Sequence, residues 1–309
     1  MDSVLARSFT VWCGEHSGWR LSVRVERWLK GAWSLLLLVA GGWLFSSVAG
    51  SNEWQRAWTT GLGLGAPLLI LLLLPAVSHF IKMLGWRALL PPEARPPLPK
   101  AYAAFVAAQG INELGFSVLG EPLKVVVLPA NARAAGVKAV VADNLAALAA
   151  LFAVVATLAQ LGIAAVPLLL LSYVLLRRVS GERWQPVLCA FLAHYVGKLW
   201  LVVELGLGLH FLGEPALHTS GQLALAWLGA AAVGAPVPGQ LGVVEAALLH
   251  AGTALGIGSS SLVTLALIRR LRSLLWTVIG LGLAARIVRR QTLPESAKID
   301  ARRLDPHVA

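Results

Sequence analysis

Long apolar stretches constrain the fold of this chain more than any other feature. Each of the four clearest is about as long as the roughly 20 residues that a helix needs to cross the ~30 Å hydrocarbon core of a bilayer; they are 31–50, 61–81, 187–211 and 262–288. Only 13% of the residues are charged and the mean hydropathy is +0.73, whereas a soluble domain carries about 25% charged residues. The sequence therefore predicts an all-α integral membrane protein.

A fifth apolar stretch, 139–176, is too long for a single crossing. Its one polar turn is Gln160-Leu161-Gly162, so we expect two short helices that meet there. Pro167 is expected to kink the second helix near its start.

Lysine and arginine are unevenly distributed between these stretches, and this bias predicts the orientation. The segment 51–60 carries one arginine, the segment 212–221 carries no lysine or arginine, and both are assigned to the outside. The basic residues gather in segments that we assign to the cytoplasm, namely 20–30, 82–100, 124–138, 177–183 and 286–303. We expect a multi-pass protein of the inner (cytoplasmic) membrane with both termini in the cytoplasm.

This orientation requires two segments to return to the side from which they start. Residues 101–123 begin and end in the cytoplasm, and residues 222–258 begin and end outside, so each is expected to form a re-entrant hairpin. Three crossings per half then invert the second half, 159–290, relative to the first, 31–158. The predicted fold has about six transmembrane helices and two re-entrant hairpins in an inverted repeat; the alternative is eight plain spans.

Two flanking segments differ from the membrane domain, 31–290. Residues 1–30 mix basic residues with tryptophan and valine, which predicts a cytoplasmic amphipathic segment. Residues 291–309 are expected to form a disordered cytoplasmic tail. The net charge of +11 is concentrated between the apolar stretches, which favours membrane lipids rather than nucleic acid as partners.

The segment 235–248 breaks the backbone inside a stretch as apolar as a membrane helix. It reads Ala-Pro-Val-Pro-Gly-Gln-Leu-Gly-Val-Val-Glu-Ala-Ala-Leu, with Pro238, Gly239 and Gly242 ahead of Glu245. Broken backbone at membrane depth needs protein or a water-filled cavity beside it, and an acid there indicates a functional site. If a half-helix begins near Gly242, Glu245 either uses the positive end of that helix or pairs with an arginine and leaves the turn to an anion.

A second break, 119–124, reads Leu-Gly-Glu-Pro-Leu-Lys and contains Glu121 and Lys124. Pro122 suits the first position of a following helix. Two interpretations stay open: an ordinary helix cap at the cytoplasmic interface, or a polar rim that contacts a lipid headgroup.

Basic residues also occur within the apolar stretches. Arg269, Arg272 and Trp276 share a helical face, while Arg270 points about 100° away. We expect Arg269 and Arg272 to clamp a lipid phosphate, because the guanidinium fork suits bidentate binding; the alternative is a helix that starts near residue 274 and leaves them at the interface.

His194 and Lys198 lie four residues apart on 187–211 and form a candidate proton relay. The alternative for His194 is a hydrogen bond between helices. The sequence contains no nucleophile elbow, Walker loop or metal-ligand spacing, so we predict no cofactor and no enzymatic activity.

The motif at 235–248 resembles the signature Pro-Gly-Gly-Leu-Gly-x-x-Glu-Ala of the lysylphosphatidylglycerol synthase transmembrane region, a flippase-like family of membrane proteins. Residues 120–124 resemble its Gly-Glu-x-x-(Arg/Lys) element, and residues 269–272 resemble the arginine of its final helix. The resemblance covers residues 30–290. Gln240 replaces the second glycine, so we expect a less extreme turn.

This resemblance implies a stand-alone member that binds and translocates an anionic or isoprenoid-linked lipid. The aminoacyl-transferase domain of the full synthases is absent after Arg290, so lysine transfer is not expected. The alternatives are an accessory subunit that recruits an enzyme of hopanoid or glycolipid synthesis, and a membrane enzyme acting on lipid phosphates. The residues expected to contact the lipid headgroup are Glu121, Lys124, Pro238, Gly239, Gly242, Glu245, Arg269 and Arg272.

Overall fold

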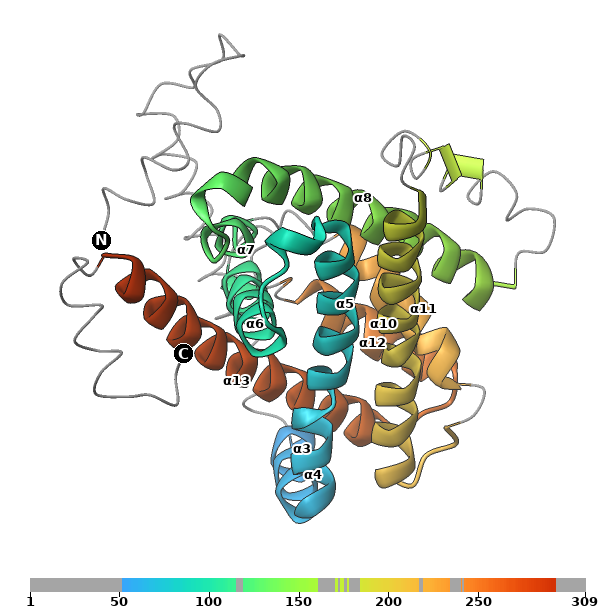
Figure 1. Cartoon of the computed structure of the whole chain (residues 1–309). Helices are drawn as coiled ribbons and strands as arrows, with labels where there is room; N and C mark the ends of the chain where they lie inside the picture. The colour runs from blue at the N-terminus through green and yellow to red at the C-terminus, as the bar shows by residue number, and fades with distance from the viewer. Residues whose placement is uncertain are drawn as a thin grey trace, which may run out of the picture. The chain divides into compact units, whose positions relative to one another are not determined.

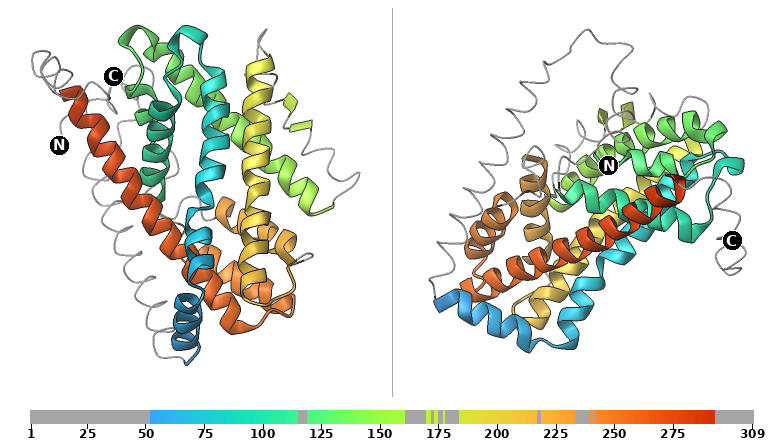
Figure 2. Two further views of the ribbon diagram at one scale, coloured as in Figure 1. Left: turned by 60° about the horizontal axis from the view of Figure 1, so that its bottom comes forward. Right: turned by 90° about the vertical axis from the view of Figure 1, so that its left-hand side faces the viewer.

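The computed structural model describes residues 52–114, 119–160, 184–216, 219–233, 240 and 242–292, with a few isolated positions between 170 and 177. Across these residues the chain is helical and contains no strand (Figures 1 and 2). The predicted all-α class is confirmed. The N-terminal segment 1–30, the expected span 31–50 and the tail from 293 onward lie outside the described residues.

Within the described ranges, four helical stretches are long and apolar enough to cross a membrane: Ala66–Leu89, Ala130–Leu158, Trp184–Phe211 and Ser259–Arg289. The first consists of α4 (Ala66–Leu73) and α5 (Pro75–Leu89), after α3 (Asn52–Gly63). The others contain α8 (Arg133–Leu158), α10 (Trp184–Phe211) and α13 (Ser259–Thr292).

The first of these stretches extends further than its apolar residues suggested. Residues 82–89 were expected to belong to a cytoplasmic loop, but α5 continues through Lys82 to Leu89. A single lysine does not interrupt a helix, whereas Pro91 does, because it restricts Leu90 to the extended conformation. Arg87 and Arg95 then donate to the carbonyl oxygens of Pro96 and Leu90, at 2.9 and 3.0 Å, and fix the turn around the 3₁₀ helix η1 (Pro92–Ala94).

The long apolar stretch 139–176 breaks where predicted, but the helix before the break has 26 residues and is not the short helix that was expected. α8 ends at Leu158, and Gln160 takes a φ of 51°, the left-handed conformation common after helix ends. Residues 161–169, including the expected kink at Pro167, lie outside the described part. α8 itself begins at Arg133, six residues before the apolar stretch, after the 3₁₀ helix η2 (Ala130–Ala132).

Two pairs of shorter helices lie in or next to the segments expected to form hairpins, and one of the four, at 122–126, extends into the expected cytoplasmic loop 124–138. α6 (Leu98–Leu114) and α7 (Pro122–Val126) form the first pair, and α11 (Thr219–Val233) and α12 (Val243–Ala254) form the second. α6, the longest of them, has 17 residues, which extend about 26 Å, less than the ~30 Å of a hydrocarbon core. Pro122 occupies the first turn of α7, as predicted.

Small residues allow the long helices to approach closely. α5 and α10 lie side by side, and α13 crosses them obliquely and packs along α6 (Figures 1 and 2). A Cβ atom on Gly85 would lie 2.8 Å from the Cβ of Ala193 on α10, and one on Gly110 would lie 2.7 Å from the Cα of Gly280 on α13. Such contacts are typical of helix association in membranes.

Two larger clusters of buried apolar residues and one small cluster form the core of the described part of the chain. One larger cluster contains Trp86 and Phe105 and is built from α5, α6 and α8 with the turn at 127–128. The other larger cluster contains Leu209 and Leu262 and is built from α10 to α13. The first of the larger clusters falls within residues 31–158 and the second within 159–290, whereas the small cluster of Ala107, Leu123 and Ala284 joins the two halves.

Candidate functional site: a cationic cavity

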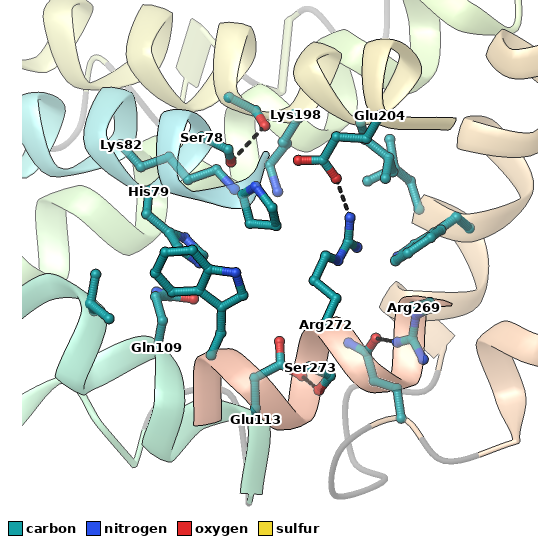
Figure 3. Close-up of a pocket in the computed structure, with 18 residues that line it drawn as sticks. Ser78, His79, Lys82, Gln109, Glu113, Lys198, Glu204, Arg269, Arg272 and Ser273 are labelled. Carbon is teal, nitrogen blue, oxygen red and sulfur yellow. Dashed lines mark hydrogen bonds and ion pairs between the residues drawn. The ribbon is translucent and has the colours of Figure 1, made fainter. Parts of the chain in front are cut away.

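A polar cavity of about 210 Å³ lies where α5, α6, α10, α11 and α13 meet (Figure 3). Four cationic and two anionic side chains line it: Lys82, Lys198, Arg269, Arg272, Glu113 and Glu204. Neutral polar groups from the same helices complete the lining, notably Ser78, His79, Gln109 and Ser273. A site of this polarity among apolar helices is a candidate for ligand binding.

Glu245 binds two of the arginines that the sequence singled out. It forms ion pairs with Arg269 and Arg270, the latter with 2.6 Å between Nη2 and Oε2. The same Oε2 accepts a hydrogen bond from the backbone N–H of Gly242 at 3.0 Å, so Glu245 also caps α12. Glu245 therefore both caps the start of α12 and pairs with arginine, two roles that were expected to be alternatives. Arg270, which was expected to point away, takes part in the pair as well.

At Gln240 and Gly242, the two described positions just before α12, the backbone takes the left-handed conformation that is usual for glycine. Gln240 has a φ of 50° and Gly242 a φ of 79°, so the expectation of a milder turn was wrong. This conformation is unfavourable for a residue with a Cβ atom, and in the structure the terminal amide of Gln240 makes two hydrogen bonds. Its Nε2 donates to the Ala231 carbonyl oxygen at 3.4 Å, and its Oε1 accepts from Arg269 at 3.5 Å.

Arg272 is bound by Glu204 on α10, across the cavity. The ring of Trp227 on α11 lies against both arginines, with its centroid 4.8 Å from the Cζ of Arg269 and 5.2 Å from that of Arg272. Cation–π contacts and ion pairs therefore hold both guanidinium groups in place. Arg269 is buried and Arg272 is partly buried, and both are paired, so they are preorganised and their charges are largely compensated.

Lys82 and Lys198 differ from the arginines, because neither makes an ion pair or hydrogen bond with another described residue. They extend toward one another from α5 and α10 (Figure 3). Gly197 provides the space for this arrangement: a Cβ atom there would lie 2.8 Å from the Cε of Lys82. Ser78 donates to the carbonyl oxygen of Gly197 at 3.2 Å and fixes the same crossing.

His79 occupies the wall next to Lys82. Its ring meets that of Trp276 edge-on, with 4.9 Å between centroids, and the Nε1 of Trp276 donates to the Leu72 carbonyl oxygen at 2.9 Å. The Nδ1 of His79 and the Nε of Arg269 are buried without a hydrogen-bond partner among the described residues. Such groups in a polar cavity are free to bind a ligand.

A second group of charges lies outside the cavity lining. Lys124 Nζ lies 2.8 Å from Glu121 Oε2 and 3.0 Å from Asp143 Oδ2, and His194 Nε2 lies 2.7 Å from Asp143 Oδ1. All four side chains are buried. We call Glu121, Lys124, Asp143 and His194 the buried ion cluster. It joins α7, α8 and α10, and Asn112 on α6 donates to Glu121 at 3.2 Å.

The predicted site residues thus divide into several groups. Arg269 and Arg272 line the cavity, and Gly242 and Glu245 support Arg269 from behind. Glu121 and Lys124 belong to the buried ion cluster instead. The predicted relay pair is divided as well, because His194 bonds to Asp143 while Lys198 lines the cavity. Pro238 and Gly239 lie outside the described residues.

Sequence reasoning missed the contribution of α5. Pro75, Ser78, His79 and Lys82 all line the cavity, and their spacing of three, four and seven residues is that of one helix face. This polar stripe was detectable in the sequence, but the basic segment was assigned to a loop from Lys82 onward. The helix start near residue 274 is also excluded, because α13 begins at Ser259 and buries Arg269.

Comparisons of the chain with models of known protein families, with curated proteins and with solved structures give no match.

Proposed function

We propose that this protein is a membrane protein that binds a lipid with an anionic or isoprenoid-linked headgroup and moves it across the bilayer. The observation that carries the proposal is the cationic cavity, which lies among helices that are apolar and long enough to span a membrane. Cationic groups at such a depth are rare and mark ligand pathways. Glu113 is exposed and lines the cavity, which gives the headgroup a polar point of entry.

The outer surfaces of the same helices suit lipid tails. α13 carries Arg269 and Arg272 on its cavity side and exposes Leu274 and Val278. α10 likewise exposes its apolar residues Leu188, Leu192 and Val196. A lipid with its headgroup in the cavity and its tails along these helices would bury both parts in a matching environment.

The arrangement of helices supports the inverted repeat as part of this proposal. In such a repeat α5 to α8 correspond to α10 to α13. Two pairs of contacts follow this correspondence: α6 packs on α13 as α11 packs on α8, and α7 packs on α8 as α12 packs on α13. The extensive packing of α8 on α10 has no comparable counterpart between α13 and α5. Each short pair also places a glutamate beside its second helix, Glu121 before α7 and Glu245 in α12. Two re-entrant hairpins and about six crossings in the inner membrane, with cytoplasmic termini, account for these features.

The same features support membership of the flippase-like family as part of the proposal. Glu245 begins a short helix after a broken turn and binds an arginine of the last long helix. The ion pair between Glu245 and Arg269 gives a physical reason why the family motif has a glutamate after its glycines and an arginine in its final helix.

Reconstitution into liposomes tests the function. The full chain is inserted into phosphatidylcholine vesicles that contain a fluorescent anionic lipid, and the dye in the outer leaflet is quenched with a membrane-impermeant reductant. We expect quenching beyond the outer-leaflet half in vesicles with protein, and a slower rate for Arg272→Gln. Exposed Arg133→Gln is the matched control. Vesicles with protein that behave like empty ones would contradict transport.

A further inference from the structure

The charges in the cavity do not balance. Arg272 is compensated by Glu204, and Glu245 lies between Arg269 and Arg270. Glu113 accepts a hydrogen bond from Ser273 at 2.6 Å at the exposed edge. Lys82 and Lys198 have no such partner among the described residues. With His79 neutral, the lining side chains carry an excess of two positive charges.

Two ammonium groups that point toward each other in a confined space repel, and an anion between them removes that repulsion. The protein maintains the arrangement by several devices. Gly197 leaves space for the stem of Lys82, Ser78 fixes the crossing of α5 and α10, and no described carboxylate forms an ion pair with either lysine, although Glu113 and Glu204 line the same cavity. These features indicate a binding site for an anion rather than a structural ion pair.

We propose that Lys82 and Lys198 form a subsite for a dianionic phosphate monoester, with the Nδ1 of His79 as an additional hydrogen-bond partner. This inference rests on the proposed function and specifies its substrate class. A phosphate monoester carries about −1.5 to −2 charges at pH 7, because its second pKa is near 6. It therefore matches the excess of two charges. A phosphodiester headgroup carries one charge and leaves one lysine uncompensated.

The size of the cavity supports a small headgroup. A volume of about 210 Å³ suits a phosphate group with its adjoining carbons, whereas sites for drug-sized ligands span ~300–1,000 Å³. The favoured ligands are thus lipids that end in a phosphate monoester, such as a phosphatidic acid or a polyprenyl monophosphate. Free inorganic phosphate shares the same chemistry and is the second source to be distinguished.

The test compares ligands on the purified full chain in detergent at pH 7.5. Dioleoyl phosphatidic acid, dioleoyl phosphatidylglycerol and sodium phosphate are titrated separately, and binding is measured by native mass spectrometry and by the shift in melting temperature. We expect phosphatidic acid to bind at least about tenfold more tightly than phosphatidylglycerol, the factor given by one additional charge contact of about 1.4 kcal/mol. The preference should shrink below pH ~6, where the headgroup loses its second charge.

The variants Lys82→Met and Lys198→Met, alone and together, should remove this preference. Exposed Lys138→Met on α8 is the matched control and should retain it. Folding is checked in the same melts: without ligand the double variant should melt at or above the wild-type temperature, because two unpaired cations have been removed. A stable double variant that still prefers phosphatidic acid would overturn the subsite, as would equal binding of both lipids by the wild type.

The outcomes of these experiments distinguish a failure of the phosphate subsite from a failure of the proposed lipid function. Binding of sodium phosphate that depends on both lysines, with no binding of either lipid, would keep the subsite and contradict the lipid function. Transport in vesicles at equal rates for phosphatidic acid and phosphatidylglycerol would keep the function and contradict the subsite.

Discussion

Lys124 is the single cation that joins two buried carboxylates, and replacing it gives the sharpest test of the buried ion cluster. Its side chain is 1% exposed, as is Asp143, and Glu121 is 6% exposed. Lys124→Met keeps the volume of the side chain but leaves both carboxylates without their cation. Breaking a buried pair in this way destabilises a protein by about 3–5 kcal/mol. At about 2 °C per kcal/mol for a chain of this size, the melting temperature should fall by roughly 6–10 °C.

The rescue variant separates lost charge from lost packing. Lys124→Met combined with Glu121→Gln and Asp143→Asn removes all three charges in near-isosteric form, and we expect it to recover most of the melting temperature. Melting is followed by tryptophan fluorescence in detergent. A fall of less than about 2 °C for Lys124→Met, or a triple variant as unstable as the single one, would refute the reasoning. Lys124 does not line the cavity, so lipid preference should persist below the melting temperature of the single variant.

Two further predictions concern helix packing and the hairpin at α12. Gly280→Ala places a Cβ 2.7 Å from the Cα of Gly110 and 2.8 Å from the Val106 carbonyl oxygen, so α6 and α13 must separate, and we expect a loss of about 1–3 kcal/mol. Gly282→Ala meets no atom within 4 Å and is the control in the same thermal melts. Glu245→Gln retains an oxygen to cap α12 but removes the charge that binds Arg269 and Arg270, so we expect a loss of about 3–5 kcal/mol and slower lipid movement. Unchanged melting and transport in that variant would show that the pair does not fix the arginines.

Much of the fold followed from the sequence because membranes impose simple rules. Helices that cross a bilayer must be long, apolar and internally hydrogen-bonded, so residues 187–211 and 262–288 identified α10 and α13 within a few residues at each end. Prolines, glycines and the polar turn at residue 160 indicated where helices end, because these effects are local. The pairing of Glu245 with an arginine was also foreseen as one of two options.

The composition of the site was decided by tertiary structure. Arg269 and Arg272 were recognised as charges out of place, but only the packing of α10, α11 and α12 against α13 shows that Glu204, Glu245 and Trp227 hold them. Lys82 was assigned to a loop, since charge alone does not distinguish a loop from a helix face that lines a cavity. His194 and Lys198 share a face in sequence, yet one meets Asp143 on α8 and the other the cavity.

The sequence by itself thus determined the all-α class, the approximate ends of α10 and α13 and several points where the backbone breaks, because length, hydropathy and turn chemistry act within a few residues. It did not predict the helix at 52–63 or the continuation of α5 beyond residue 81, because both carry polar residues. Only the tertiary structure decided which charges are compensated. An ion pair such as Arg272 with Glu204 joins residues far apart in the chain, and its formation depends on how two helices cross. For the same reason Lys82 and Lys198, rather than Arg269 and Arg272, form the centre of the proposed phosphate site.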